Sequence, residues 1–159
     1  MKKTVKITAD GQTIEAIEES PLLPALQDAG IDIPTLCYHR AVSPYGACRL
    51  CLVEVNQKGW DDDWWKLTTS CNFPVLDGLT VRTDSEKVKK HRKLVIELIM
   101  ARAPGAPQVR EIAEKLGVED ARHRPQEGEL CILCGLCARV CDEVIGARVL
   151  TFHGRGGQK

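Results

Sequence analysis

The stretch IPTLCYHRAVSPYGACRLCLVEV, residues 33–55, places three cysteines in a long loop that runs directly into an apolar strand. The spacing is C-x10-C-x2-C, and a fourth cysteine follows nineteen residues later, which gives the set Cys37, Cys48, Cys51 and Cys71. Four thiolates are the ligand set of a [2Fe–2S] cluster, and a long loop can supply three of them while its N–H groups point at the sulfur atoms. The first gap is longer than in the plant-type C-x4-C-x2-C spacing, so the pattern predicts a variant [2Fe–2S] site.

Zinc is the alternative metal for this set of cysteines. A C-x2-C pair with two distant cysteines is compatible with tetrahedral zinc. A zinc ribbon, however, usually has two C-x2-C knuckles in one module, whereas Cys37 and Cys71 stand alone. Gly46 and Ala47, just before Cys48, are small enough for the backbone to approach a cluster. The residues therefore favour iron–sulfur, and a zinc-stabilised interaction module remains the alternative from another functional class.

The residues around this loop have the order of a β-grasp domain. Residues 3–8 and 12–17 alternate as two strands around the hairpin turn Asp10-Gly11. Ser20 as N-cap and Pro21 at the first helical position predict a short helix that ends at Gly30, with an apolar face of Leu22, Leu23 and Leu26. Further strands are predicted at residues 52–55, 66–70 and 79–82. The segment 56–65 holds all three tryptophans and is interpreted as a long hairpin tip. Its Trp side chains either pack on their own strands or contact a partner, and we favour partner contact.

The second half of the chain is predicted to be mainly helical. Residues 84–102 read as a helix whose core face is Val88, Leu94, Val95, Leu98 and Ile99. A second helix is predicted at 108–116, ended by Gly117, and a charged linker at 118–129. Residues 148–152 are predicted to form a strand.

A second run of cysteines lies in ELCILCGLCARVCDE, residues 129–143. Its C-x2-C-x2-C-x3-C spacing is typical of bacterial-type iron–sulfur proteins, in which a tight loop brings thiolates to one cubane cluster. Gly135 supplies the backbone freedom for such a loop. The run predicts a [4Fe–4S] cluster at Cys131, Cys134, Cys137 and Cys141. The fourth ligand is either Cys141 or a residue of a partner chain, and the division of eight cysteines into two sets of four favours Cys141.

Composition narrows the class of function. The 22 basic and 22 acidic residues give a net charge of zero. The chain therefore lacks the excess of basic residues typical of a nucleic-acid-binding protein, and the acidic surface typical of a mobile carrier that finds its partners by charge. The N-terminus MKKTVKITADG lacks the apolar core of a signal peptide, and no apolar run is long enough to cross a membrane. Eight cysteines without a secretory signal favour metal ligation over disulfides and predict a cytoplasmic protein.

The sequence contains no pattern typical of a catalytic site. It has no G-x-G-x-x-G motif, no P-loop and no nucleophile–base pair. Asp61, Asp62 and Asp63 are interpreted as a solvated hairpin tip. His39 is predicted to be a hydrogen-bonding residue of the loop, and the other histidines are interpreted as exposed or helix-surface residues: His91, His123 and His153.

Two stretches carry a family resemblance. Residues 33–55 and SCNFPVLDGLTVRTDSEKVKKHRKLVIELIMAR at 70–102 resemble the N-terminal [2Fe–2S] domain of NuoG-type subunits of respiratory complex I. They are also similar to HoxU-type subunits of NAD-linked hydrogenases, to iron-only hydrogenases and to NAD-linked formate dehydrogenases. CILCGLCARVCDEVIGARVLTFHGRG at 131–156 resembles the [4Fe–4S] segment of those proteins. The resemblance implies that the first four cysteines hold a [2Fe–2S] cluster and that Cys131, Cys134 and Cys137 are ligands of a [4Fe–4S] cluster.

The chain departs from these relatives in three places. The gap before Cys71 is longer and contains the Trp-rich residues. Relatives carry a His-x3-Cys-x2-Cys-x5-Cys loop between the long helix and the next one, where this chain has ARAPGAPQ at 101–108, without histidine or cysteine. The chain also stops after HGRGGQK, where relatives continue into a further cluster run or a catalytic domain, so we expect no flavin, nicotinamide, molybdopterin or hydrogenase domain.

Together these observations predict an α+β protein. The expected parts are a β-grasp [2Fe–2S] domain at 1–83, a helical connector at 84–128 and a [4Fe–4S] ferredoxin-like segment at 129–159. The expected role is a non-catalytic electron-transfer subunit that connects a flavin/NAD(P)-binding subunit to a catalytic oxidoreductase subunit, such as a hydrogenase or formate dehydrogenase. The alternative within this class is a free-standing ferredoxin.

Overall fold

The computed structural model describes residues 3–122 and 129–154, so the middle of the predicted linker, His123 included, lies outside the described residues. Five strands form one mixed sheet: β1 (Thr4–Ala9), β2 (Gln12–Ile17), β3 (Leu52–Asn56), β4 (Lys66–Thr69) and β5 (Thr80–Arg82). Their order in the sheet is β2-β1-β5-β3-β4. β1 is antiparallel to β2 and parallel to β5, and β3 is antiparallel to both β5 and β4.

The strand predictions for the N-terminal half are confirmed. Asp10 and Gly11 have φ angles of 48° and 85°, as a two-residue hairpin turn with positive φ at both positions requires, and Ala9 pairs with Gln12. Glycine adopts such a φ without strain, and aspartate is among the few other residues that tolerate it. The fold class is α+β, as expected.

Helix α1 (Leu22–Asp28) begins one residue later than predicted, and Ser20 does not cap it. The Ser20 hydroxyl instead donates to the Ile17 carbonyl at 2.6 Å and closes the turn after β2. The first free N–H groups of the helix donate to the chain that follows β4: Leu22 N to Phe73 O and Leu23 N to Ser70 O, both at 2.9 Å. Main-chain carbonyls on either side of Cys71 therefore satisfy donors that a capping side chain would otherwise take.

The first hydrophobic core lies between α1 and the sheet. Leu22, Leu23 and Leu26 are fully buried, which confirms the predicted apolar face. They pack with inward-facing residues of all the strands except β4, and two cysteines of the first set belong to the same cluster: Cys51 and Cys71. These two thiols are thus part of the core that holds the sheet and α1 together.

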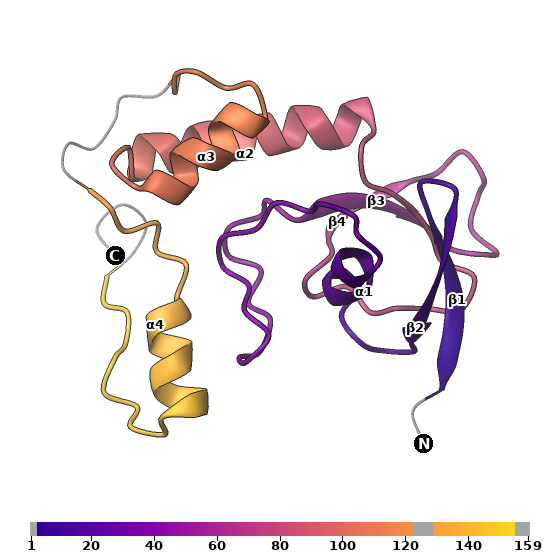
Figure 1. The fold of residues 1–159 in the computed structure, drawn as a ribbon, viewed down its shortest axis with the longest axis horizontal. Helices are drawn as coiled ribbons and strands as arrows, with labels where there is room; N and C mark the ends of the chain where they lie inside the picture. The colour runs from indigo at the N-terminus through magenta and orange to yellow at the C-terminus, as the bar shows by residue number, and fades with distance from the viewer. Residues whose placement is uncertain (1–2, 123–128, 155–159) are drawn as a thin grey trace.

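Helices α2 (Glu86–Arg102) and α3 (Pro107–Lys115) lie side by side over the loop and the sheet (Figure 1). The predicted core face of α2 is partly wrong. Val88 is buried and Val95 and Ile99 are half-buried, but Leu94 and Leu98 are 43% and 49% exposed. The buried face is centred on Val88, Arg92 and Ile96 instead. A charged residue in the middle of that face conceals it from a pattern based on apolar residues.

The second hydrophobic core forms between α2, α3 and the loop that precedes β3. Its buried members include Cys37, Cys48, Leu50 and Ile96, together with residues of α3 such as Val109. Cys37 and Cys48 therefore face a different core from Cys51 and Cys71. The four cysteines of the first set lie where the two cores meet.

Two of the three tryptophans in the segment 56–65 pack on other parts of the chain. Trp60 is half-buried against the first core, and its ring meets that of Trp64 edge-to-face with centroids 5.0 Å apart. The Arg82 guanidinium lies 3.6 Å from the centroid of the Trp65 ring. Trp64 alone is half exposed. Partner contact by this segment stays a prediction, and Trp64 is the residue that offers surface for it.

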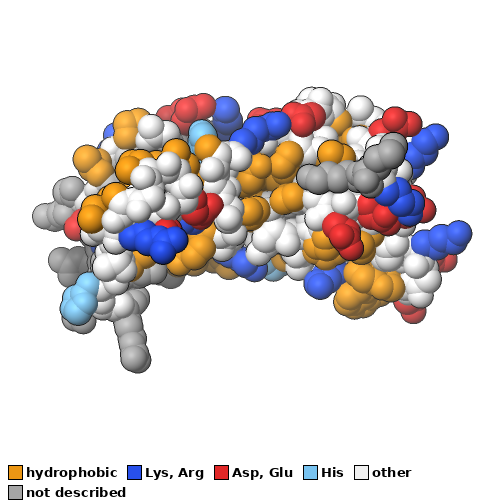
Figure 2. All heavy atoms as spheres, turned by 90° about the horizontal axis from the view of Figure 1, so that it is seen from below, with side chains coloured by type: hydrophobic (Ala, Val, Ile, Leu, Met, Phe, Trp, Pro, Cys, Tyr) orange, Lys and Arg blue, Asp and Glu red, His pale blue; other side chains and the backbone are white. Residues whose placement is uncertain are grey.

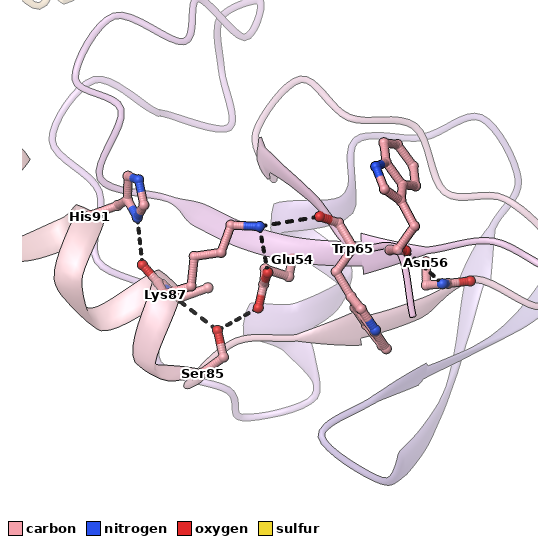
Figure 3. A network of polar contacts seen from close by, with 8 residues as sticks. Glu54, Asn56, Trp65, Ser85, Lys87 and His91 are labelled. Carbon is pink, nitrogen blue, oxygen red and sulfur yellow. Dashed lines mark hydrogen bonds and ion pairs between the residues drawn. The ribbon is translucent and has the colours of Figure 1, made fainter. Parts of the chain in front are cut away.

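A polar network joins the start of α2 to β3 (Figure 3). Ser85 caps the helix by accepting from Val88 N at 3.2 Å, and its hydroxyl donates to Glu54 Oε2 at 2.6 Å. Lys87 Nζ lies 3.0 Å from Glu54 Oε1. Burial opposes ionisation of Glu54, but the hydrogen bonds from Ser85 and Lys87 outweigh it, so the pKa of Glu54 lies below its usual value. The network fixes where α2 starts relative to the sheet.

The C-terminal part contains α4 (Leu136–Arg139), which continues into a π-helical turn, η1 (Val140–Val144). The strand predicted at 148–152 is wrong. Those residues form no ladder with any described strand, Arg148 has a φ of 54°, and Val149 is 77% exposed. A strand requires a neighbour to accept its hydrogen bonds, and this segment runs beside α4, away from the edges of the sheet (Figure 1).

Basic and acidic side chains are interspersed over the surface, with hydrophobic side chains between them, on the face shown in Figure 2. Among the described residues, no helix has both the length and the apolarity needed to cross a membrane.

We predict that Glu54→Gln destabilises the protein by about 1 to 2 kcal/mol, because it weakens a charge-assisted hydrogen bond in a buried place. For a chain of this size that is a fall in apparent Tm of about 2 to 8 °C, measured by thermal unfolding at pH 7. The pKa of Glu54 is lowered on folding, so the wild-type advantage is complete above the unfolded pKa and is lost only as pH falls through the folded pKa. The difference in Tm should therefore be constant from neutral pH down to about pH 5. Lys90→Gln, at an exposed position of the same helix, is the control.

Candidate metal centre

The first four cysteines come from three places in the chain, and all are buried. Cys37 and Cys48 lie in the loop after α1, Cys51 directly precedes β3, and Cys71 follows β4. Their exposed fractions do not exceed 7%, so the two hydrophobic cores exclude water from the thiols. The fold thus brings the predicted set together, although Cys37 and Cys71 are 34 positions apart in the sequence.

The four thiols form two pairs. Within the described residues, no three Cys, His, Asp or Glu side chains are arranged around a single ion. A hydrogen bond with Cys37 lowers the pKa of Cys48 to about 5, and a hydrogen bond with Cys71 lowers the pKa of Cys51 to about 7. The same hydrogen bonds, together with burial, raise the pKa of Cys37 and of Cys71. Each pair therefore favours one thiolate, the form that binds metal.

Main-chain N–H groups of the loop point at these sulfur atoms. Cys48 N donates to Cys37 Sγ at 3.3 Å, and Leu36 N donates to Cys48 Sγ at 3.4 Å. Gly46 is buried with a φ of 70°, and a Cβ there would lie 3.1 Å from Asn72 Nδ2. A side chain at position 46 would thus be both strained and crowded. Four buried thiols with N–H donors directed at sulfur fit a thiolate-ligated iron–sulfur group.

The second cysteine run has a different environment. Cys131 and Cys137 are exposed and Cys134 is half-buried, whereas Cys141 is buried within η1. Gly135 is the N-cap residue of α4 with a φ of 75°, and a Cβ on it would lie 3.3 Å from Phe152 and 3.4 Å from Tyr45. Cys134 packs against the second hydrophobic core, which also contains Cys37 and Cys48. Cys134 therefore lies near Cys37 and Cys48 in space, although 97 and 86 positions separate it from them in the sequence.

A clamp formed by Arg139 and Glu143 holds the second run against the first loop. The Arg139 guanidinium donates to the main-chain carbonyls of Ser43, at 2.6 Å, and of Cys37, and lies 5.3 Å from the centroid of the Tyr45 ring. Glu143 Oε2 accepts from Ser43 N at 2.6 Å. Both polar groups of the Ser43 main chain thus bond to one turn of the C-terminal segment. Arg139 makes direct contact with the backbone of a first-set cysteine.

Sequence reasoning did not find this clamp. Arg139 and Glu143 lie four residues apart beside Cys137 and Cys141, a spacing that places two side chains on one helical face. Nothing in the sequence indicated that their partner would be residue 43. His39 behaves as predicted, because its Nδ1 accepts from Ala41 N at 3.2 Å. Asp61 Oδ1 accepts from Asp63 N within the exposed hairpin tip, as expected of a solvated turn.

The comparison with protein families agrees with the site. Residues 2–86, more than half of the chain, match the model of the 2Fe-2S iron-sulfur cluster binding domain. The chain belongs to this family. The match includes all four cysteines of the first set and ends at the first residue of α2.

Relatives that are similar along 96% of this chain are larger proteins. The NADPH-Fe(3+) oxidoreductase subunit alpha of Geobacter sulfurreducens is 32% identical, and the chain covers 20% of it. The mitochondrial NADH-ubiquinone oxidoreductase 78 kDa subunit of Candida albicans is 30% identical, with 24% covered. The chain thus spans about a fifth to a quarter of the length of these relatives. The alignments run over 176 and 178 positions, more than the 159 residues of the chain, so the relatives contain segments without a counterpart here.

A solved structure has the same fold. One chain of the NAD+-reducing [NiFe]-hydrogenase in its H2-reduced state superposes with a TM-score of 0.82 at 28% identity, over 97% of this chain and 72% of that one. The resemblance to complex I subunits of the G type and to NAD-linked hydrogenase subunits, predicted from the sequence motifs, is therefore confirmed.

We predict that Arg139→Gln loosens the C-terminal segment, because it removes the charged donor for two carbonyls and the cation beside Tyr45. Loss of about 1.4 kcal/mol of local stability is a tenfold rise in the opening equilibrium. Hydrogen exchange should therefore show about tenfold faster exchange at the amides of Ser43 and Ile145.

Arg148→Gln is the matched control, because Arg148, among the described residues, forms its ion pair with Asp142 of its own segment at 2.6 Å. Both variants are compared at equal iron content. Equal protection at Ser43 in the two variants would show that the clamp does not hold the segment.

Proposed function

We propose that this chain is an electron-transfer subunit that relays single electrons through one [2Fe–2S] and one [4Fe–4S] cluster. The observation that carries the proposal is the packing of Cys134 into the same core as Cys37 and Cys48, which places two cysteine sets of iron–sulfur type side by side. Family membership supports the first cluster, and the C-x2-C-x2-C-x3-C spacing supports the second.

The first cluster would be held by the two thiol pairs. Each iron of a [2Fe–2S] cluster takes two thiolates beside the shared sulfides, so Cys37 with Cys48, and Cys51 with Cys71, would each serve one iron. The N–H groups of Leu36 and Cys48 stabilise negative charge on sulfur. The surrounding side chains exclude water. When bound, each cluster accepts and passes on one electron.

The second cluster would be held by Cys131, Cys134, Cys137 and Cys141. Cys131 and Cys137 are exposed, so a cluster bound there would lie at the surface, where a partner protein can approach, whereas the first site is enclosed. The clamp of Arg139 and Glu143 keeps the two sites at a fixed separation, on which the rate of electron transfer depends steeply. We therefore assign the C-terminal site as the point where electrons enter or leave the chain.

The proposed setting is a cytoplasmic NAD(P)-linked oxidoreductase complex. The names of the relatives and of the structural neighbour include NADPH, NADH and NAD+, and several are called subunits. We propose that one partner binds the flavin and NAD(P) and that another carries the catalytic site, for example of a hydrogenase or formate dehydrogenase type. Dispersed surface charge supports docking within a complex rather than charge-steered diffusion.

Cysteine substitutions test the two clusters. The anaerobic protein should contain about six irons and six acid-labile sulfides per chain. Cys48→Ser should abolish the [2Fe–2S] EPR signal and retain the [4Fe–4S] signal, and Cys137→Ser should do the reverse. Lys90→Gln, at an exposed position of α2, is the control and should retain both. A colourless protein that contains zinc and does not bleach with dithionite would make it a zinc-stabilised module instead.

Cys141→Ser tests the fourth ligand of the second cluster. If Cys141 is a ligand, the substitution removes or strongly alters the [4Fe–4S] signal and leaves the [2Fe–2S] signal unchanged. An unaltered [4Fe–4S] signal in the isolated Cys141→Ser chain would assign the fourth ligand elsewhere.

Purification from the native source tests the setting. We expect this chain to elute with proteins that bind flavin and NAD(P), well above its own mass of 17.6 kDa. A single species near that mass, with both clusters present, would identify a free-standing ferredoxin.

A further inference from the structure

Arg92 is a buried cation next to the first cysteine set. It lies in the middle of the buried face of α2, one turn from Val88 and one turn from Ile96, and is only 6% exposed. Its Nη2 donates to the main-chain carbonyl of Leu52 at 2.7 Å, and Leu52 directly follows Cys51. Its Nε is buried without a hydrogen-bond partner among the described residues. The guanidinium therefore points at the start of β3, where Cys51 is held.

A buried guanidinium needs an opposite charge. Removing a cation from water is unfavourable unless an anion or hydrogen bonds compensate. Within residues 3–122 and 129–154, the ion pairs do not include Arg92. Burial lowers the pKa of Arg92, and the anion that opposes this most is Cys51, ahead of Asp84, Asp32 and Asp10. The group with the strongest electrostatic interaction is thus a cysteine of the first set.

We propose that Arg92 is the buried counter-charge of the cluster held by Cys37, Cys48, Cys51 and Cys71, and that it raises the reduction potential of that cluster. This inference rests on the proposed function of the first cysteine set. A thiolate-ligated [2Fe–2S] cluster is anionic, and one-electron reduction makes it more so. A fixed cation nearby stabilises the reduced form more than the oxidised form, and low exposure to water strengthens the effect.

The rest of the fold holds Arg92 in this place. Glu54, two residues after Leu52 on β3, binds Ser85 and Lys87 at the start of α2 (Figure 3). These contacts fix the helix to the strand one to two turns before Arg92. The hydrogen bond from Nη2 to the Leu52 carbonyl then fixes the guanidinium relative to the main chain beside Cys51. Arg92 acts by its charge and position and does not bind the iron.

Redox titration of the full anaerobic chain, monitored by EPR, tests the proposal. Arg92→Gln removes the charge and retains a donor for the Leu52 carbonyl. We expect the ratio of reduced to oxidised [2Fe–2S] cluster at a fixed ambient potential to fall about tenfold, a shift of about 59 mV to lower potential for one electron. Arg92→Lys keeps the charge, so its reduction potential should fall by less than half as much as that of Arg92→Gln.

Lys93→Gln is the matched control. It removes the same charge one residue away on the exposed side of α2, where water and salt screen it. Its effect on the ratio should be less than about twofold, and should vanish at high salt, whereas the effect of Arg92→Gln should persist. An equal shift in Arg92→Gln and Lys93→Gln, or a shift of Arg92→Gln to higher potential, would overturn the proposal.

Arg92→Met covers the case in which Arg92→Gln does not take up a cluster, because methionine fills a similar volume without a polar group. A Met variant with the lowered potential supports the counter-charge. If neither the Gln nor the Met variant holds the [2Fe–2S] cluster, Arg92→Lys decides: a fall of the ratio by more than about threefold, although the charge is kept, would overturn the proposal. A wild-type chain without a [2Fe–2S] signal would contradict the proposed function itself. Failure of the proposed function is thereby distinguished from failure of the proposal for Arg92.

Discussion

The loop of residues 33–51 has no regular secondary structure, yet it must hold buried thiols in fixed positions. Its main chain lacks the hydrogen-bond ladder that defines a strand or helix, so its shape depends on what packs around it. The N–H groups of Leu36 and Cys48 bond to sulfur, and the carbonyls of Cys37 and Ser43 accept from Arg139, about a hundred residues further along the chain. The sheet, the helices and the C-terminal segment all serve to support this loop.

Three kinds of buried ionisable group surround the loop, and the charge of each is compensated in a different way. Glu54 is compensated by Ser85 and Lys87, which makes it an anchor between β3 and α2. The four thiols form hydrogen bonds in pairs, and main-chain N–H groups donate to their sulfur atoms. Among the described residues, the Arg92 side chain has one hydrogen bond, to the carbonyl of Leu52, which directly follows Cys51. The positive charge of Arg92 thus lies beside the first cysteine set, where a bound anionic cluster would compensate it.

The connector between the two cysteine sets is compact. α2 passes into α3 through a short turn at residues 103–106. The two helices pack against each other and against the loop around Cys37, and Cys134 reaches the same core. Direct contact through Arg139 and Glu143 then joins the two sets without an intervening site.

The sequence by itself determined the features that local physics controls. The Asp10-Gly11 turn, the alternating strands and the leucine face of α1 follow from backbone and side-chain preferences within a few residues, and the cysteine spacings indicated the chemistry of both sets. Tertiary structure decided the rest, because it depends on partners distant in the sequence. Carbonyls near Cys71 replaced the Ser20 cap, a buried Arg92 turned Leu94 and Leu98 outward, and residues 148–152 found no strand to pair with. The clamp of Arg139 on Cys37 and Ser43 belongs to the same class: a hydrogen bond between residues so far apart leaves no periodic or local trace in the chain.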